Sequence, residues 1–327
     1  MSCFNVIFSL FSSLSSDKEL EACILQTVEC LVESSVSEKR LERIMILANL
    51  FNAIPDKSKL RFNVLTSLLS FVNESGAYDS LPNQFSNLES WAVEWKLEPT
   101  ELASLYWLIA KVQNGGKREK EGFAVQVKWL RTLEQVPNLD WEAYKVQVAS
   151  VCLNAIRIDD LFQFDALMDN ALVARLADDA TYKVHHSLLR IFVYDKMEQL
   201  NAFMKEHPSF LREHDLGVDA LQRKLRLLSL TQLALASFKL TYEEVASSLV
   251  IDIGAVEQWV MDAVAVGLID ARIDGINKVV FVSRATQRAF SSGDWKMLQT
   301  NLGEWKKNVA SILGVIQNAK SSAAAMK

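Results

Sequence analysis

The chain has 327 residues, half of them apolar, with only 11 Gly and 5 Pro, a composition that favours helix over sheet or disorder. This length suffices for two units, or for one domain with a long repeat array. A net charge of −5 and a pI near 5.6 exclude a general attraction to nucleic acid or acidic lipid. Four cysteines without CxxC spacing exclude a disulfide scaffold and favour a reduced, cytoplasmic compartment.

The first stretch, Met1–Leu14, is apolar but has neither a basic n-region nor an A-x-A-like cleavage site, so we do not interpret it as a signal peptide. Its apolar residues recur at helical spacing and predict a helix packed on its successor: Phe4, Ile7, Phe8, Phe11 and Leu14. No run in the chain approaches the roughly 20 apolar residues that span a bilayer, so we expect no membrane partner.

Residues 1–214 are predicted to form one helix after another. Apolar residues recur every three or four positions, as in Leu20, Ile24, Val28 and Leu31. Breakers separate the stripes, including Pro55, Pro99, Pro137, Pro208 and the C-cap-like Asn114-Gly115-Gly116. Later helices are expected at about 119–135, 140–156 and 182–206. Antiparallel helices with such short joints stack into an α-solenoid, here without a recognisable repeat consensus.

Residues 215–284 have the pattern of a winged helix. The apolar run from Leu225 to Phe238 predicts a buried helix, and a capping box at Thr241…Glu244 starts a second. A third helix runs from about Gly254. The period then changes to two over 269–274, Asp274-Gly275 supplies a turn, and a β-branched strand follows. Three helices and a two-stranded hairpin are typical of this module.

The final segment, 285–327, contains a heptad seam with apolar residues spaced alternately by three and four. It comprises Trp295, Leu298, Leu302, Trp305, Val309, Ile312 and Ile316. Two interpretations remain open at this point. The helix either packs back on its own winged helix or offers the seam to a bundle with other subunits, because apolar surface left after a core closes often marks an interface.

We find no pattern that supports catalysis. The four histidines lie outside any HExxH or Cys/His ligand spacing, and Gly115-Gly116-Lys117 lacks the frame of a P-loop. We therefore expect no enzyme, with no catalytic, metal-binding or cofactor-binding residues and no cofactor.

The winged helix also raises the question of DNA. Its third helix, 254–267, offers Glu257, Gln258 and Asp262 and no basic residue, so phosphate would repel it. Sequence-specific DNA binding is disfavoured. The other use of an exposed hairpin is to pair its edge with a strand of a partner protein. The predicted wing-edge residues are Val279, Val280, Phe281, Val282 and Ser283.

A solenoid that runs without a linker into a winged helix and a terminal helix resembles the PCI-domain family. Its members are subunits of the proteasome lid, the signalosome and eukaryotic translation initiation factor three. The stretches 225–230, 256–260 and 278–284 and the Trp295…Trp305 tail are most similar to the initiation-factor branch. The family usually has more helical sequence before the counterpart of Ser16, where this chain has Met1–Leu14. A shortened gene model is one interpretation of that departure.

The resemblance implies a non-catalytic scaffold subunit. PCI subunits join wing edge to wing edge and gather their last helices in one bundle, and the complex acts on the small ribosomal subunit. A scaffold of the signalosome or lid is the first alternative, and a winged-helix nucleic-acid binder is the second. The expected partners are other PCI subunits and, through the complex, the small ribosomal subunit.

Overall fold

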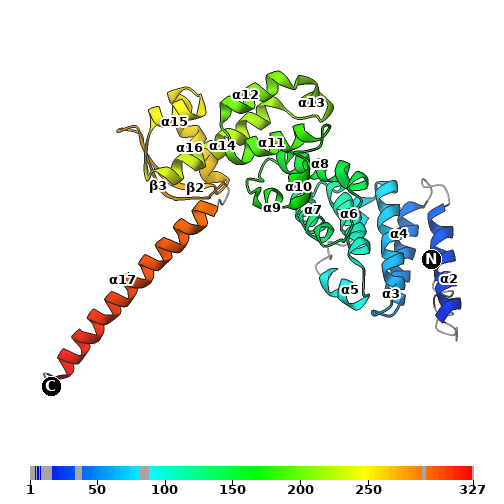
Figure 1. Cartoon of the computed structure of the whole chain (residues 1–327). Helices are drawn as coiled ribbons and strands as arrows, with labels where there is room; N and C mark the ends of the chain where they lie inside the picture. Colours follow the sequence, from blue (N-terminus) through cyan, green and yellow to red (C-terminus); the bar gives the residue numbers. More distant parts are fainter. Residues whose placement is uncertain are drawn as a thin grey trace. The chain divides into compact units, whose positions relative to one another are not determined.

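The computed structural model describes residues 4, 6, 8, 17–33, 39–80, 88–288 and 292–325. Over these residues the chain is mostly helical, with one small antiparallel sheet (Figure 1). This confirms the predicted class of helical solenoid followed by a winged helix and a C-terminal helix. Packing divides the chain into two units: an N-terminal unit, Met1–Leu161 with Ala166–Arg190, and a C-terminal unit, Phe162–Asp165 with Ile191–Lys327. The sequence pattern changes at about residue 214, later than this division.

The N-terminal unit is a stack of helices whose neighbours in sequence pack against each other (Figure 1). Its members are α2 (Asp17–Glu33), α3 (Arg40–Ala53), α4 (Leu60–Ser75), the 3₁₀ turn η1 (Tyr78–Ser80), α5 (Leu88–Glu94), α6 (Pro99–Gly115), α7 (Glu119–Glu134), α8 (Trp141–Arg157) and α10 (Ala171–Arg175). The short α9 (Asp165–Met168) lies where the units divide. Apolar stripes close the core, and Leu47, Leu69 and Ile109 are fully buried. Of the predicted first helix, Phe4 and Phe8 are helical, while Ile7, Phe11 and Leu14 lie outside the described residues.

The joint between α6 and α7 differs in detail from the predicted glycine cap. The left-handed residue is Lys117, with φ 58°, and the Arg118 N–H donates to the Gln113 carbonyl at 2.9 Å. Gly115 is required for another reason, because a Cβ there would overlap the Tyr78 ring. The glycine therefore permits a close approach between α6 and η1.

The single helix expected over 182–206 is wrong. The structure has α11 (Lys183–Tyr194) and α12 (Met197–Glu206), followed by α13 (Pro208–Glu213), which begins at a predicted proline boundary. The distant Arg288, which is 5% exposed, binds the backbone at this break. Its guanidinium donates to the carbonyls of Ile191 and Phe192 at 2.6 Å and of Asp195 at 2.9 Å. The bonds to Phe192 and Asp195 satisfy carbonyls that a continuing helix would have used, whereas the Ile191 carbonyl also accepts the Asp195 N–H at 3.1 Å.

The three predicted helices of the winged helix are α14 (Val218–Ala236), α15 (Tyr242–Leu249) and α16 (Val256–Ala265), the last preceded by the 3₁₀ turn η2 (Ile253–Ala255). The capping box is confirmed: the Thr241 N–H donates to Glu244 Oε2 at 2.9 Å, and the Glu244 N–H to Thr241 Oγ1 at 3.3 Å. The buried run ends earlier than expected. Leu235 is 46% and Phe238 83% exposed, since α14 stops at Ala236 and the chain turns extended at Ser237.

The predicted hairpin is part of a three-stranded sheet. Its strands are β1 (Lys239–Thr241), β2 (Ile269–Asp274) and β3 (Val279–Ala285), in the order β1-β3-β2. Leu240 and Val280 are register partners, and both are buried where β1 and β3 pack on α14. In the turn, the Asp274 carboxylate accepts from the Asn277 N–H at 3.1 Å, and the left-handed residue is Lys278 rather than Gly275.

Candidate functional site

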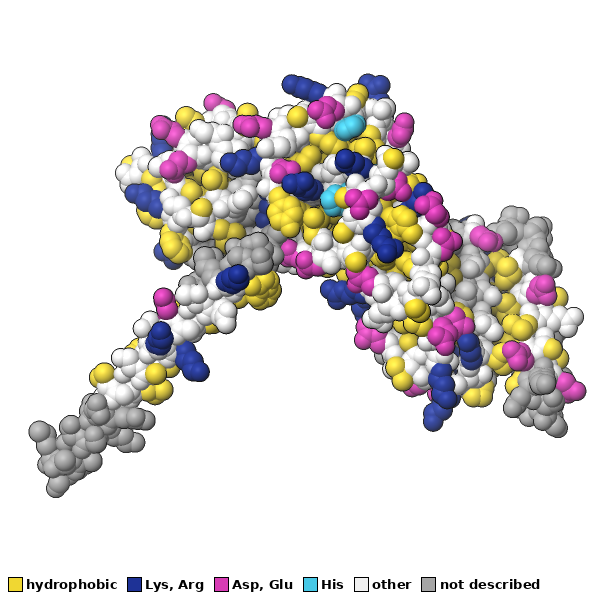
Figure 2. Space-filling view, viewed as in Figure 1, with side chains coloured by type: hydrophobic (Ala, Val, Ile, Leu, Met, Phe, Trp, Pro, Cys, Tyr) yellow, Lys and Arg dark blue, Asp and Glu magenta, His cyan; other side chains and the backbone are white. Residues whose placement is uncertain are grey.

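The C-terminal helix α17 (Ser292–Ala325) carries all seven residues of the predicted seam. Their exposed fractions run from 39% at Leu298 to 72% at Trp305, and Figure 2 shows hydrophobic side chains along the surface of this helix. A spacing of three and four keeps them on one side, because a helix turns once in about 3.6 residues. The described part of the chain therefore leaves a long apolar stripe open to solvent.

The apolar surface of α17 is wider than the seam. Leu313 and Val315 beside it are 52% and 66% exposed. Burying one side chain of this size stabilises an assembly by about 1.5–3 kcal/mol, so the seam offers on the order of 10 kcal/mol before the costs of association. That is enough for a stable protein interface.

The predicted wing edge requires a correction. β3 is the central strand of the sheet, and its residues Val279 to Phe281 pair with β1 on one side and β2 on the other. The next residue, Val282, donates its N–H to the Phe238 carbonyl at 2.9 Å. From Val279 to Val282, both sides of β3 are therefore already paired within the chain, and a partner strand cannot join them. The sequence missed β1, because three residues with one buried side chain are too short for a period-two signal.

The outer strand of the sheet is β2, and its backbone orientation follows from the register of the three strands. The Lys278 carbonyl and the Val282 N–H face β1, so by alternation Val279 and Phe281 face β2. Their partners Asp274 and Arg272 must then face β3. The alternate residues Ala271 and Ile273 consequently present their N–H and C=O groups on the outer side of the sheet. β2, rather than β3, supplies the edge that a partner strand can join.

The surface of α16 is acidic, and its carboxylates accept hydrogen bonds from side chains of the same chain. Glu257 accepts from the Tyr242 hydroxyl at 2.9 Å, and Asp262 accepts from Gln258 at 2.8 Å and from Arg223 at 3.3 Å. Burial, followed by this bond to Glu257, raises the pKa of Tyr242 to about 12. A helix with two carboxylates and no basic side chain does not fit a phosphate backbone.

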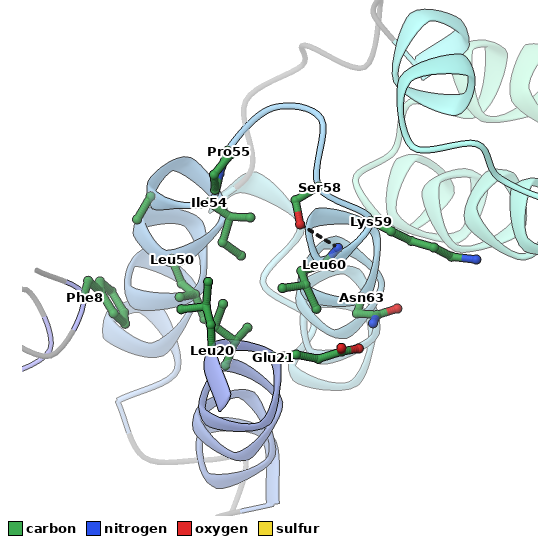
Figure 3. A pocket seen from close by; sticks show the side chains of 12 residues that line it. Phe8, Leu20, Glu21, Leu50, Ile54, Pro55, Ser58, Lys59, Leu60 and Asn63 are labelled. Carbon is green, nitrogen blue, oxygen red and sulfur yellow. Dashed lines mark hydrogen bonds between the residues drawn. The ribbon is translucent and has the colours of Figure 1, made fainter. Parts of the chain in front are cut away.

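A hollow of about 650 Å³ lies among the first helices of the N-terminal unit (Figure 3). It is lined mainly by apolar side chains, among them Phe8, Leu20, Leu50 and Leu60. The Lys59 ammonium at its rim pairs with Glu101 rather than turning to the hollow. Its polar lining residues are Glu21, Ser58, Lys59 and Asn63, and the Ser58 hydroxyl accepts from the Leu60 N–H at 3.3 Å.

No group of three or more His, Cys, Asp or Glu side chains in the described part of the chain could hold a metal ion. None of the helices described is both long and apolar enough to cross a membrane.

Arg288 is the structural residue that sequence reasoning missed. Its role depends on carbonyls that lie more than 90 residues earlier in the chain, and no local pattern marks it. Burial lowers its pKa to about 10, and the nearby Asp195 charge opposes that shift. It ties the segment after β3 to the end of α11, shortly before α17 begins.

Comparison with known proteins agrees with this architecture. Residues 183–284, from the first residue of α11 to the end region of β3, match the model of the PCI domain. The chain is 29% identical over 325 residues to a protein of Dictyostelium discoideum, covering 98% of this chain and 79% of the relative. It is 25% identical over 320 residues to one of Phaeosphaeria nodorum (97% and 72%) and 24% identical over 276 residues to one of Nematostella vectensis (84% and 71%). All three are named eukaryotic translation initiation factor 3 subunit M. The chain therefore carries a region, residues 183–284, that matches the PCI domain, and over nearly its whole length it is similar to proteins named subunit M of eukaryotic translation initiation factor 3.

Proposed function

We propose that the chain is a non-catalytic scaffold subunit of eukaryotic translation initiation factor 3 and that it acts in the cytoplasm. The similarity to subunit M over nearly the whole chain supports this assignment. The observation that carries the scaffold role is the exposed seam of α17. An apolar stripe of this length is costly in water and is stabilised by a cover of similar chemistry.

In this proposal two surfaces hold the chain in its complex. The seven seam residues of α17 join a helical bundle with the last helices of other PCI subunits. The outer edge of β2 pairs with a strand of a neighbouring PCI subunit and takes the place of the β3 edge expected from sequence. The complex then supports initiation on the small ribosomal subunit, and neither a membrane nor specific DNA is a partner.

The alternative is a PCI scaffold of the signalosome or the proteasome lid. The physics of assembly would be the same, and only the companions would differ. The names of the relatives favour the initiation factor, and the acidic α16 disfavours the nucleic-acid binder.

Affinity purification of a tagged chain from eukaryotic cells tests the assignment. We expect the wild-type chain to retain other subunits of initiation factor 3 together with small ribosomal subunits. Recovery of signalosome or lid subunits instead would overturn it.

A proline pair tests the β2 edge. Ala271→Pro removes an N–H that faces outward, whereas Arg272→Pro removes one that faces β3 and serves as the control for damage to the sheet. We expect Ala271→Pro to remain folded but to lose a neighbouring subunit. If Ala271→Pro remains folded and retains the full set of companions, the edge has no such role.

A further inference from the structure

The helices of the N-terminal unit carry a regularly spaced amide. Asn73, Asn114 and Asn154 lie in the last turns of α4, α6 and α8, respectively. In sequence, 41 residues separate the first two and 40 separate the second two. The recurrence matches the alternate helices of the stack and places one side-chain amide at the same end of each.

These three amides line one groove. A hollow of about 510 Å³ is bordered by all three asparagines together with Gln126 of α7 and Ser150 of α8. A smaller hollow of about 160 Å³ shares Asn114 and Asn154 with it. The groove therefore crosses α4, α6, α7 and α8, and all of it belongs to the N-terminal unit.

Several polar side chains of the groove have weak hydrogen bonds, or none, with the described residues. Asn73 Nδ2 reaches the Leu108 carbonyl only at 3.4 Å. The side-chain amides of Asn114 and Asn154 make no hydrogen bond within the described part of the chain. Gln126 is 2% exposed, and its Oε1 accepts no hydrogen bond from any described residue. Buried polar groups in folded proteins are normally paired, so the unpaired Gln126 carbonyl, together with the half-exposed asparagines, points to a ligand that brings both donors and acceptors.

The charges of the groove indicate the class of that ligand. Glu74 and Lys111 are the charged residues of the larger hollow, and their charges cancel. Lys111 lies with its Nζ 5.7 Å from the centre of the Trp107 ring. A single-stranded nucleic acid requires a clearly positive groove, which is not present here. A peptide backbone is neutral and alternates N–H with C=O, and a primary amide matches both.

We propose that this groove binds an extended peptide segment of a partner protein through its backbone. An extended chain rises about 3.3 Å per residue, so a segment of several residues is needed to cross α4, α6, α7 and α8 and meet all three asparagines. Trp107 offers an apolar wall to one peptide side chain. The proposal is independent of the scaffold assignment, because none of its residues lies in α17 or the sheet.

The probe is a set of peptides of about 12 residues. They are selected from a random displayed library for binding to the full chain. Fluorescein-labelled copies of the selected peptides are then measured by anisotropy against wild type, Asn114→Ala, Asn154→Ala and the control Asn49→Ala, an exposed asparagine of α3 outside the groove. We expect the control to bind like wild type and each groove variant to raise Kd at least about tenfold. Methylation of the central backbone nitrogens of the peptide should abolish binding.

Hydrogen exchange of the unaltered chain with a selected peptide keeps the test decisive if a variant fails to fold. Protection at the last turns of α6 and α8 supports the proposal, and protection confined to other regions overturns it. Equal affinity for all four proteins also overturns it. Binding of an oligouridylate that the two groove variants abolish would assign the groove to RNA instead.

Discussion

The β3 strand and the α17 helix were both predicted to be partner surfaces, and the structure treats them differently. β3 is covered by its own chain, because β1 pairs with the side that the hairpin alone would have left open. Within the described residues, the side chains of the α17 seam, from Trp295 to Ile316, remain at least 39% exposed. An apolar sequence pattern therefore indicates that a surface is buried, but it does not show whether the same chain or a partner buries it. A helix carries its whole stripe locally, whereas the availability of a strand depends on residues about 40 positions away.

The largest loss of stability is expected at Arg288, which connects the segment after β3 to the end of α11. Arg288→Ala removes three hydrogen bonds and leaves the carbonyls of Phe192 and Asp195 without their guanidinium donor, while the Ile191 carbonyl keeps the Asp195 N–H, so we expect the free energy of unfolding to fall by about 4 kcal/mol. Urea denaturation measures it, and Arg288→Lys should recover only part because it lacks the planar fork. A loss below about 1 kcal/mol in Arg288→Ala would show that water replaces the guanidinium.

Val280→Pro sharpens the contrast between a covered and an open strand. It removes a ladder donor in the central strand and a fully buried side chain, so we expect a loss of about 3 kcal/mol or more in the free energy of unfolding. Ala271→Pro on the outer strand should cost much less, about 1 kcal/mol. Equal losses by chemical denaturation would mean that β2 is not an open edge.

Gln126→Met tests the cost of an unpaired buried polar group in the N-terminal unit, where none of the described residues pairs with it. The substitution removes an unpaired buried carbonyl at similar volume, so we expect the free energy of unfolding to rise by about 1 kcal/mol. Thermal unfolding measures the change. A lowered melting temperature would show that Gln126 already has a partner, such as an ordered water.

A smaller effect is expected from Tyr242 at high pH. Its folded-state pKa, about 12, exceeds the ordinary value of 10.0, so the stability it contributes is present below pH 10 and is lost as the pH rises towards 12. Tyr242→Phe lacks this titration and should show a flatter decline in the free energy of unfolding over that range. Identical pH profiles would rule out this contribution.

Much of this architecture could be predicted from sequence because its determinants are local. The capping box at Thr241 and the seam of α17 depend on residues at most a few positions apart. The break after Tyr194 could not be predicted, since the group that satisfies its carbonyls, the Arg288 guanidinium, lies more than 90 residues away in the chain. β1 was missed for a similar reason: Lys239–Thr241 becomes a strand only because β3 pairs with it. The amide groove became visible only after the ends of α4, α6 and α8 were placed.

In the proposed assembly the apolar seam of α17 binds other subunits. The variant Trp305→Asp separates this role from packing within the chain. An unpaired charge buried in such an interface costs several kcal/mol, whereas Trp305 is 72% exposed in this chain alone. Asn308→Asp adds the same charge at an exposed position outside the seam and is the matched control. We predict that Trp305→Asp keeps the wild-type circular dichroism but co-purifies without other initiation factor 3 subunits, while Asn308→Asp retains them. Full recovery of the complex with Trp305→Asp, or collapse of its isolated fold, would contradict the account.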